Sequence, residues 1–373
     1  MADELNRRGF LGALGAGGVV LATGLPAEAS GRALSTVYIG GYTDSGGPGL
    51  QVGSVDPTSG KLTVASTVKG VRNPSWYAFS ADRKVLYSTN ENTPGGAVSA
   101  FGLADPTKPK LLNTVQTKGT GTTHVSVHPS GKYLLAANYD SGSVSVLAVK
   151  ADGSIGAVTD HVKHTGTRDD AHAHQTVTDP SGKWIVSVDL GADSVYVYSL
   201  NLTTGKLTQK QQLKLPSGAG PRHLAFNPNG RYAYILGELR SEITVVAWDP
   251  TAGKLTPGQV IGTLPGGTTV ENFPGEIQIS GDGRYVYTSN RGHDSLATFT
   301  TNETGDKLTF VTTTPTGGKY PRHFTLDPSG NWVYASNQNS NLLTWLPRDP
   351  ATGKLSPSVG SVSVKAVAVV AFR

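Results

Sequence analysis

Short runs of alternating or apolar residues, separated by turn residues, fill the chain from Thr36 to its C-terminus. The run 194–200, SVYVYSL, alternates with a period of two, which is typical of a β-strand. Six longer segments share one order: an apolar strand, a turn of the Pro-Ser-Gly-Lys type, an aromatic and apolar strand, and a polar end. Their equivalent turn positions recur every 47 to 53 residues, at Arg83, Gly131, Gly182, Gly230, Gly283 and Gly330.

A second turn motif, Asp-Pro-x-x-Gly-Lys-Leu, lies between these segments. It begins at Asp56, Asn201, Asp249 and Asp349, with weaker copies from Val149 and Thr301. Asp or Asn caps a tight hairpin turn with its side chain, and glycine supplies the positive φ that such a turn requires. Each repeat therefore contains four antiparallel strands. Four strands in a repeat of this length are typical of a β-propeller blade.

The number of blades follows from the two ends of the chain. The run VYIGGYT from Val37 resembles the second strand of a seventh repeat but has no first strand upstream. The apolar run 361–373 at the C-terminus is a spare strand that would supply it. We therefore predict an all-β, seven-bladed β-propeller with four antiparallel strands per blade, its first blade closed by the N- and C-terminal strands. Two stacked β-sandwiches are disfavoured by the regular spacing, and a WD40 propeller by the lack of a recurring Gly-His…Trp-Asp pattern.

Residues 1–29 have the pattern of a twin-arginine signal peptide. Arg7 and Arg8 precede an apolar, Gly/Ala-rich stretch that reaches Leu25, and Ala27-Glu28-Ala29 offers a cleavage site. A disordered tail and a membrane anchor are the alternatives, but the glycines in the apolar stretch make it a weak membrane span. We expect a secreted or periplasmic protein whose residues 30–373 form one propeller domain, with no membrane attachment after removal of the signal.

Composition excludes several classes of function. The chain has 373 residues, of which 37% are hydrophobic and 16% charged, so global disorder is excluded. The net charge of +5 is scattered without a basic run, which argues against nucleic acid as a partner. Cysteine is absent, which excludes disulfides, thiolate metal sites and cysteine nucleophiles. We expect a monomer, as propellers with closed rings often are.

The repeats differ from one another where the first strand of each blade begins, on the face where propellers bind ligands. Those starts carry Ser75, Thr123, His174, Arg222, Gly275 and Arg322, and the following positions carry Trp76, His124, Gln175, His223, Glu276 and His323. A packing requirement would keep such positions alike, so this variation favours a ligand site. Three arginines, Arg222, Arg291 and Arg322, would form an anion pocket. His174 and Glu238 are the candidate acid and base, and Glu276 is a third titratable group.

Structural roles compete with these functional ones. His223 and His323 recur in Pro-Arg-His segments and are candidates for structural hydrogen bonding, and Asn138 is a candidate for tying strand ends together. The pair His172 and His174 alone is a weak signal for a metal. A ring of oxygen ligands would suit Ca²⁺, with Asn90, Glu91, Asp189 and Asn290 as its members. Motifs for a serine nucleophile elbow, a zinc protease and a phosphate-binding loop are absent from the sequence.

The sequence resembles the seven-bladed β-propeller lactonase family, which includes 6-phosphogluconolactonases of one bacterial type and fungal carboxymuconate cyclases. The segments that carry the resemblance include VYIGGYT, HPSGKYLLAANY, AHAH, GPRHLAFNPNGRYAYILGEL and GEIQISGDGRYVYTSNR, and together with YPRHFTLDPSGNWVYASNQ they extend over Thr36 to Arg373. The resemblance implies a catalytic set of His174, Arg222, Glu238 and Arg291, without a metal or organic cofactor. Arg322 matches a recurring family position. The predicted signal peptide departs from the family's best-known enzymes, which act inside cells.

These features lead to one main expectation and two alternatives. We expect an exported lactonase that hydrolyses, or a cyclase that forms, the lactone of an anionic small molecule such as a sugar acid or a carboxymuconate-type acid. Arg322, Glu276, His172 and Asn138 would contribute to substrate binding. The first alternative is a non-catalytic propeller that binds an anionic ligand or an envelope partner. The second is a Ca²⁺-dependent lactonase of the other propeller type.

Overall fold

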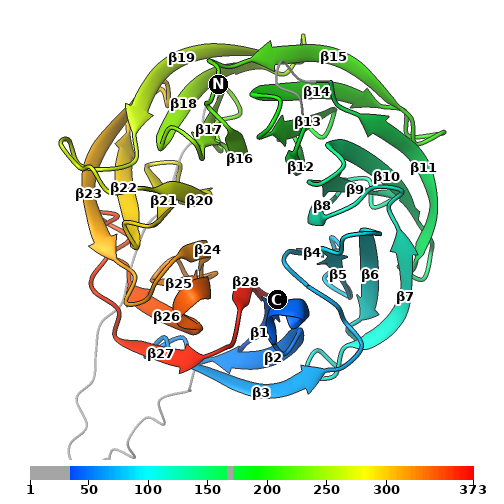
Figure 1. Cartoon of the computed structure of the whole chain (residues 1–373), viewed down its shortest axis with the longest axis horizontal. Helices are drawn as coiled ribbons and strands as arrows, with labels where there is room; N and C mark the ends of the chain where they lie inside the picture. The colour runs from blue at the N-terminus through cyan, green and yellow to red at the C-terminus, as the bar shows by residue number, and fades with distance from the viewer. Residues whose placement is uncertain (1–33, 166–170) are drawn as a thin grey trace, which may run out of the picture. The chain divides into compact units, whose positions relative to one another are not determined.

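The computed structural model describes residues 34–165 and 171–373, and the predicted signal peptide at 1–29 lies outside the described residues. Seven four-stranded antiparallel sheets follow one another around a ring, as blades around a central axis (Figure 1). The predicted all-β, seven-bladed propeller is thus confirmed. Two 3₁₀ turns, Thr43–Ser45 and Gln338–Ser340, are the helical elements of the described chain. Within the described part, no helix is long and apolar enough to cross a membrane.

Each blade runs from an innermost to an outermost strand in chain order, except blade 1, whose innermost strand comes from the C-terminus. Blade 1 contains β28 (Val367–Phe372), β1 (Ser35–Gly41), β2 (Leu50–Val55) and β3 (Leu62–Val68). Blade 2 contains β4 (Tyr77–Phe79), β5 (Val85–Asn90), β6 (Ala97–Gly102) and β7 (Lys110–Gln116). Blade 3 contains β8 (Thr122–Val127), β9 (Tyr133–Asn138), β10 (Ser143–Val149) and β11 (Ile155–Lys163). Blades 4 and 5 contain β12 (Ala173–Thr178), β13 (Trp184–Asp189), β14 (Ser194–Leu200), β15 (Leu207–Lys214); and β16 (Pro221–Phe226), β17 (Tyr232–Gly237), β18 (Glu242–Asp249), β19 (Lys254–Gly262). Blades 6 and 7 contain β20 (Phe273–Ile279), β21 (Tyr285–Arg291), β22 (Ser295–Thr301), β23 (Leu308–Pro315); and β24 (Pro321–Leu326), β25 (Trp332–Asn337), β26 (Leu342–Pro347), β27 (Gly360–Ser363).

The six aligned turns after the innermost strands have one backbone conformation. Five of them place a glycine at φ between 69° and 75°, and the sixth places Arg83 at φ 54°. A side chain is disfavoured in this left-handed region, which explains why the position is almost always glycine. In return, the guanidinium of Arg83 donates a hydrogen bond of 2.9 Å to the carbonyl of Phe372 in the closing strand.

The hydrophobic core lies between neighbouring blades, whose sheets pack face to face. One cluster joins Trp184 and Val186 of blade 4 to Ile235 and Trp248 of blade 5. The two repeated turn motifs meet at these contacts. A Cβ on Gly253 would overlap the indole of Trp184, and the Trp184 Nε1 donates a 2.7 Å hydrogen bond to the carbonyl of Pro250. The glycine of one turn motif is therefore needed because an aromatic residue from the preceding blade packs on it.

The two chain ends close the ring at blade 1, where β28 pairs with β1 in antiparallel register (Figure 1). One detail of our prediction was wrong: the run 361–373 is not a single closing strand. Its first part forms β27, which pairs with β26 as the outer strand of blade 7. Only β28 belongs to blade 1. The division arises because blade 7 has its own outer position to fill before the chain crosses to the neighbouring blade.

A β-bulge at the start of the innermost strands positions the site. In blade 4, Ala173 pairs with Asp189 and Gln175 with Val188, so His174 is left without a partner in the ladder. The same irregularity skips Arg222 in blade 5 and Arg322 in blade 7. Because a bulge leaves one residue unpaired and redirects its side chain, these residues can point toward the axis of the ring.

Candidate active site

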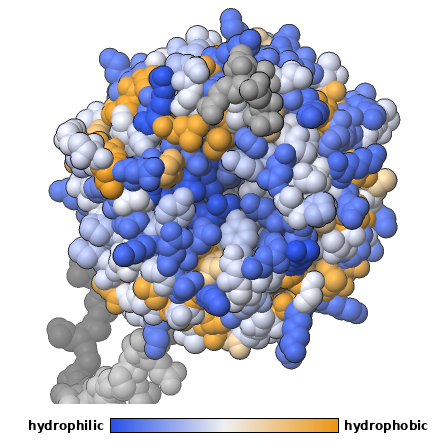
Figure 2. Space-filling model, in the orientation of Figure 1, coloured by the Kyte–Doolittle hydropathy of each residue, from blue (hydrophilic) through white to orange (hydrophobic). Residues whose placement is uncertain are grey.

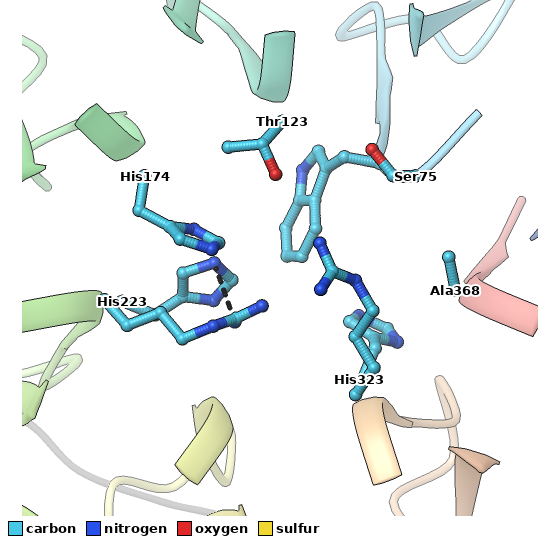
Figure 3. Close-up of a pocket in the computed structure, with 9 residues that line it drawn as sticks. Ser75, Thr123, His174, His223, His323 and Ala368 are labelled. Atoms are coloured by element: carbon cyan, nitrogen blue, oxygen red, sulfur yellow. Dashed lines mark hydrogen bonds between the residues drawn. The ribbon is translucent and has the colours of Figure 1, made fainter. Parts of the chain in front are cut away.

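The bulged residues meet in one pocket on the propeller axis, where the empty space, counted together with the solvent that opens onto it, is about 230 Å³. The centre of the face in Figure 2 is hollowed and surrounded mainly by hydrophilic residues. In the view of Figure 3, His174 and His223 lie across the pocket from Ser75 and Ala368. The complete lining is Ser75, Trp76, Thr123, His174, Arg222, His223, Arg322, His323 and Ala368. All but one of these lining residues are ones that the comparison of repeats placed at the strand starts.

Arg222, Arg291 and Glu238 form one buried ionic cluster. Oε2 of Glu238 lies 2.7 Å from Nη2 of Arg291 and 3.0 Å from Nε of Arg222, although the Nε–H of Arg222 does not point at this oxygen. Arg222 is 2% exposed and also donates a hydrogen bond to the carbonyl of Gly275. Burial, followed by the charges of Arg291 and Arg322, lowers the pKa of Arg222 to about 9. Arg222 therefore remains cationic at neutral pH and is held rigidly at the pocket.

His174 stands beside this cluster as a neutral imidazole. Its ring centroid lies 5.0 Å from that of His223 and 5.5 Å from that of Tyr139, edge-on in both cases. Nδ1 of His174 is buried without a hydrogen-bond partner among the described residues. Burial, and then the positive charge of Arg222, places the pKa of His174 well below its usual value. His174 can therefore accept a proton at neutral pH, which an already protonated imidazole could not do.

Beneath the pocket, Glu276 lies between two histidines. Its Oε1 lies 3.1 Å from Nδ1 of His223, and its Oε2 lies 3.6 Å from Nε2 of His323. The carboxyl group is almost fully buried, and burial raises the pKa of Glu276 to about 7, although the charges of His323 and Arg222 act in the opposite direction. Trp76 packs edge-on against both histidine rings, with centroid distances of 5.3 Å. Glu276 thus lies below the lining and contacts it through the two histidines.

Arg322 lines the pocket and contacts a different carboxylate from the ionic cluster. Its Nη2 lies 3.6 Å from Oε2 of Glu91, and its guanidinium lies over the ring of Tyr42 at 5.3 Å. The hydroxyl of Tyr42 donates a 2.8 Å hydrogen bond to the same oxygen of Glu91. Arg322 therefore has a looser ionic contact than either Arg222 or Arg291.

The two remaining residues predicted for substrate binding lie outside the lining. His172 stacks on Tyr139 at 4.4 Å, and its Nδ1 lies 3.0 Å from the carbonyl of Tyr139, so it supports a residue that contacts His174. Asn138 is fully buried, and its amide bonds to Thr117, Thr122 and residues of β10. The hydrogen-bonding groups of Asn138 are thus used within the fold.

The four residues considered for Ca²⁺ have other partners. The Asp189 carboxylate accepts hydrogen bonds from the backbone N–H groups of His172 and Ala192, and one oxygen lies 2.7 Å from Nδ1 of His164. Asn90 donates to the carbonyl of Arg72 and accepts the hydroxyl of Ser99. Asn290 donates to the carbonyl of Thr263, and Glu91 accepts the hydroxyl of Tyr42. Across residues 34–165 and 171–373, no three His, Cys, Asp or Glu side chains are grouped so that they could hold a metal ion.

Ala368 is the lining residue that our reading of the sequence missed. In the pairing of β1 with β28, Gly40 pairs with Val369 and Gly41 with Val367, so Ala368 is left without a partner. His174, Arg222 and Arg322 are left unpaired in the same way in their own blades. The closing strand has no Pro-Ser-Gly-Lys turn after it, so the repeat alignment had nothing to anchor it. An alignment of the apolar alternation in β28 alone could have identified the position.

Comparisons with known proteins agree with this fold. Residues 36–372 match the protein family described as "Lactonase, 7-bladed beta-propeller". The 6-phosphogluconolactonase of Bacillus subtilis (strain 168) is 34% identical over 334 residues, which cover 88% of this chain and 95% of that protein. The 6-phosphogluconolactonase of Formosa agariphila is 30% identical over 336 residues, which cover 86% of this chain and 94% of that protein.

Among solved structures, the periplasmic gluconolactonase of Pseudomonas aeruginosa superposes with a TM-score of 0.87 at 32% identity, covering 91% of this chain and 99% of that one. The family match and these relatives confirm the prediction of an enzyme of the lactonase class. The chain therefore belongs to the seven-bladed β-propeller lactonase family.

Proposed function

We propose that this protein hydrolyses the lactone of an anionic small molecule of the sugar-acid type. The observation that carries the proposal is a buried arginine, Arg222, fixed at the pocket by Glu238 and placed beside the neutral imidazole of His174. An ester carbonyl needs a fixed positive charge where its oxygen becomes negative, and the attacking water needs a base. The names of the relatives in Bacillus subtilis and Pseudomonas aeruginosa support a sugar lactone as the substrate.

In the proposed reaction, His174 accepts a proton from water while the water oxygen adds to the lactone carbonyl. The ring C–O bond of the tetrahedral intermediate then breaks, and the imidazolium of His174 returns the proton to the departing ring oxygen. The product is the open hydroxy acid. We assign the base to His174 in preference to Glu238, because Nδ1 of His174 has no hydrogen-bond partner among the described residues, whereas the carboxylate of Glu238 is engaged by two arginines and lies outside the pocket lining.

Arg222 would stabilise the negative charge on the carbonyl oxygen during this step. Glu238 and Arg291 then act as positioning residues, because both belong to the cluster that holds Arg222. Arg291 is itself anchored by hydrogen bonds of 2.7 and 3.2 Å to the carbonyls of Phe273 and Pro274. A preorganised charge of this kind needs little rearrangement when the reaction occurs.

Variants of these residues test the proposal on the purified chain. We expect His174→Asn and Arg222→Gln each to lower kcat for lactone hydrolysis about 100-fold or more, as loss of a general base or of an oxyanion donor typically does. Proton release would be followed with δ-gluconolactone, 6-phosphogluconolactone and a muconolactone-type acid as substrates. Arg240→Gln, at an exposed arginine close to Glu238 in the sequence, is the matched control and should retain activity.

Full turnover by folded His174→Asn and Arg222→Gln proteins would contradict this assignment. Absence of turnover on every lactone by the unaltered chain would contradict hydrolysis itself. Formation of a lactone from a carboxymuconate-type acid would identify the reverse, cyclase reaction. Anion binding without turnover in either direction would support a non-catalytic binding propeller.

We further propose that the protein is exported by the twin-arginine route. The support is the sequence of residues 1–29, together with a Pseudomonas aeruginosa relative that is named as periplasmic. In a Gram-negative host, we expect the full chain to reach the periplasm in a shortened form. Changing Arg7 and Arg8 to Lys should hold it in the cytoplasm at full length, whereas Arg32→Lys should not. Immunoblots of cell fractions measure this, and equal periplasmic amounts of all three proteins would refute the proposal.

A further inference from the structure

The three arginines of the mouth differ in how their N–H groups are used. Arg222 and Arg291 share the carboxylate of Glu238, and both donate to backbone carbonyls of blade 6. Those carbonyls belong to Phe273, Pro274 and Gly275 at the start of β20. Each of these two guanidiniums is therefore held in place by protein groups before any substrate arrives.

Arg322 has no such anchoring. It donates no hydrogen bond to any residue of the described chain, and its nearest carboxylate oxygen, on Glu91, lies at 3.6 Å. That distance is longer than a charge-assisted hydrogen bond, which is normally below 3 Å. A guanidinium has five N–H donors, so most of the donors of Arg322 are available. Its side chain is 16% exposed.

The neighbours of Arg322 keep it in this state. Tyr42 packs against the guanidinium and donates its hydroxyl to Glu91, so this oxygen of Glu91 is already engaged. Three arginines and two carboxylates, Glu91 and Glu238, lie at the mouth, and a third carboxyl group, Glu276, lies beneath the lining with a pKa raised to about 7. On the other side of the pocket, Ser75, Thr123 and Ala368 add no charge. A single anionic group of a ligand in this pocket would therefore bind most favourably at Arg322.

We propose that Arg322 is the anion anchor of this pocket and binds the acidic group of the substrate, a phosphate or a carboxylate remote from the lactone carbonyl. The inference rests on the proposed function and divides the arginines by role: Arg222 serves the reacting carbonyl, and Arg322 serves the substrate's own charge. It also limits the substrate to one such group, because the pocket is lined by no other cation with free donors among the described residues.

Binding of inorganic phosphate to the full chain tests the anchor without any turnover. Calorimetry should show phosphate binding to the unaltered protein and to the Arg240→Gln control, and a loss of about 10- to 100-fold in affinity for Arg322→Gln, which is typical for one charge-assisted partner. Arg322→Lys should recover part of the affinity, because it keeps the charge without the fork. Glu91→Gln should bind phosphate more tightly, because it removes the carboxylate that is in ionic contact with Arg322.

Kinetics distinguish the two acidic groups and separate this inference from the proposed function. The ratio of kcat/KM for 6-phosphogluconolactone, or for a carboxylated glucarolactone, to that for neutral δ-gluconolactone should fall about 10- to 100-fold in Arg322→Gln, mainly through KM. The acid whose ratio falls identifies the natural group.

An unchanged ratio, or phosphate affinity that is unaffected by Arg322→Gln, would overturn the anchor while leaving the proposed hydrolysis intact. No turnover on any lactone, combined with phosphate binding that depends on Arg322, would overturn the hydrolysis and leave the anchor standing. If the unaltered protein bound no phosphate and showed no preference for either acidic lactone, the anchor would be refuted.

Discussion

Glu238 determines what its two neighbouring arginines can do. Its carboxylate is one of the charges that oppose the lowering of the pKa of Arg222, so it helps to keep a fully buried guanidinium cationic. Replacing one member of a buried ionic group leaves the others uncompensated, which commonly costs several kcal/mol. Glu238 is thus important even if it never exchanges a proton with the substrate. The same chemical type, a glutamate at the mouth, has a different role at position 91, where it leaves Arg322 loosely held.

Glu276 gives a pH prediction at the residue scale. Its pKa is raised to about 7 in the folded protein, so its stabilising contribution is complete at low pH and is lost as pH rises through about 7. Glu276→Gln has no carboxyl group to ionise. We therefore expect the stability of this variant relative to the unaltered protein to increase with pH between about 4.5 and 8, by roughly 3 kcal/mol in total.

Thermal unfolding of both proteins across that pH range measures the effect. The lowered pKa of His323, about 4, acts in the opposite direction, and its contribution also differs between the two proteins at low pH, because the charge of Glu276 opposes that lowering. That histidine contributes stability above about pH 6.5 and loses it as pH falls toward 4. A difference that stays constant with pH would show that Glu276 does not titrate in this window.

At the scale of the element, the bulged innermost strand is the unit that builds the pocket. A regular strand pairs every residue with its neighbour, whereas a bulge leaves one residue unpaired and turns it. Several blades have this bulge at the same position. The side chain of the unpaired residue differs from blade to blade and carries an imidazole, a guanidinium, a hydroxyl or a methyl group. The backbone feature is therefore shared, and only the side chains specialise.

The glycine turns give a prediction at this scale, because two of them have the same backbone but different surroundings. Gly131 and Gly60 both have φ 69°, yet a Cβ on Gly131 would meet nothing within 4 Å, whereas one on Gly60 would overlap the ring of Trp332. We expect Gly131→Ala to cost about 1 kcal/mol for the left-handed backbone alone. Gly60→Ala should cost about 1–3 kcal/mol more through the clash with Trp332 of the preceding blade, blade 7.

The midpoints of thermal unfolding of the two variants provide the measurement. Gly131→Ala is the control for the cost of a side chain in the left-handed backbone conformation, because both glycines have the same φ. Only Gly60→Ala adds a clash between blades. Equal losses in both variants would mean that the blades can move apart at no cost, and that the contact between the turn and the aromatic ring does not hold them.

At the scale of the whole molecule, closure of the ring joins the ends of the chain. Blade 1 takes β28 from the C-terminus, and its core with blade 7 includes Val37, Tyr334 and Val370. The same closure completes the pocket, because Ala368 occupies the mouth position of blade 1. A pocket on the axis thus requires all seven blades in place, although its charged residues come mainly from blades 4 to 7.

Much of this architecture could be predicted from the sequence, because the same turn and strand pattern recurs in almost every blade. Six copies of one turn and several of a second established the strand order, the number of blades and the aligned strand starts. The seven-bladed fold and most of the pocket lining followed from register alone, as with His174, Arg222 and Arg322. The seventh copy was harder, since β28 lacks the turn that marks the others, and the division between β27 and β28 was not foreseen.

What each neighbouring side chain does was decided by the tertiary structure. Sequence comparison placed Arg222, Arg291 and Arg322 in one class, because an alignment reports residue type and position but not which hydrogen bonds are already made. Folding brings Glu238 to two of these arginines and leaves the third with free donors. Likewise, each turn motif was recognisable locally, but their contact across blades arises only when the sheets stack around the ring. Local periodicity is encoded in consecutive residues, whereas partnership between distant residues depends on the curvature that closes the propeller.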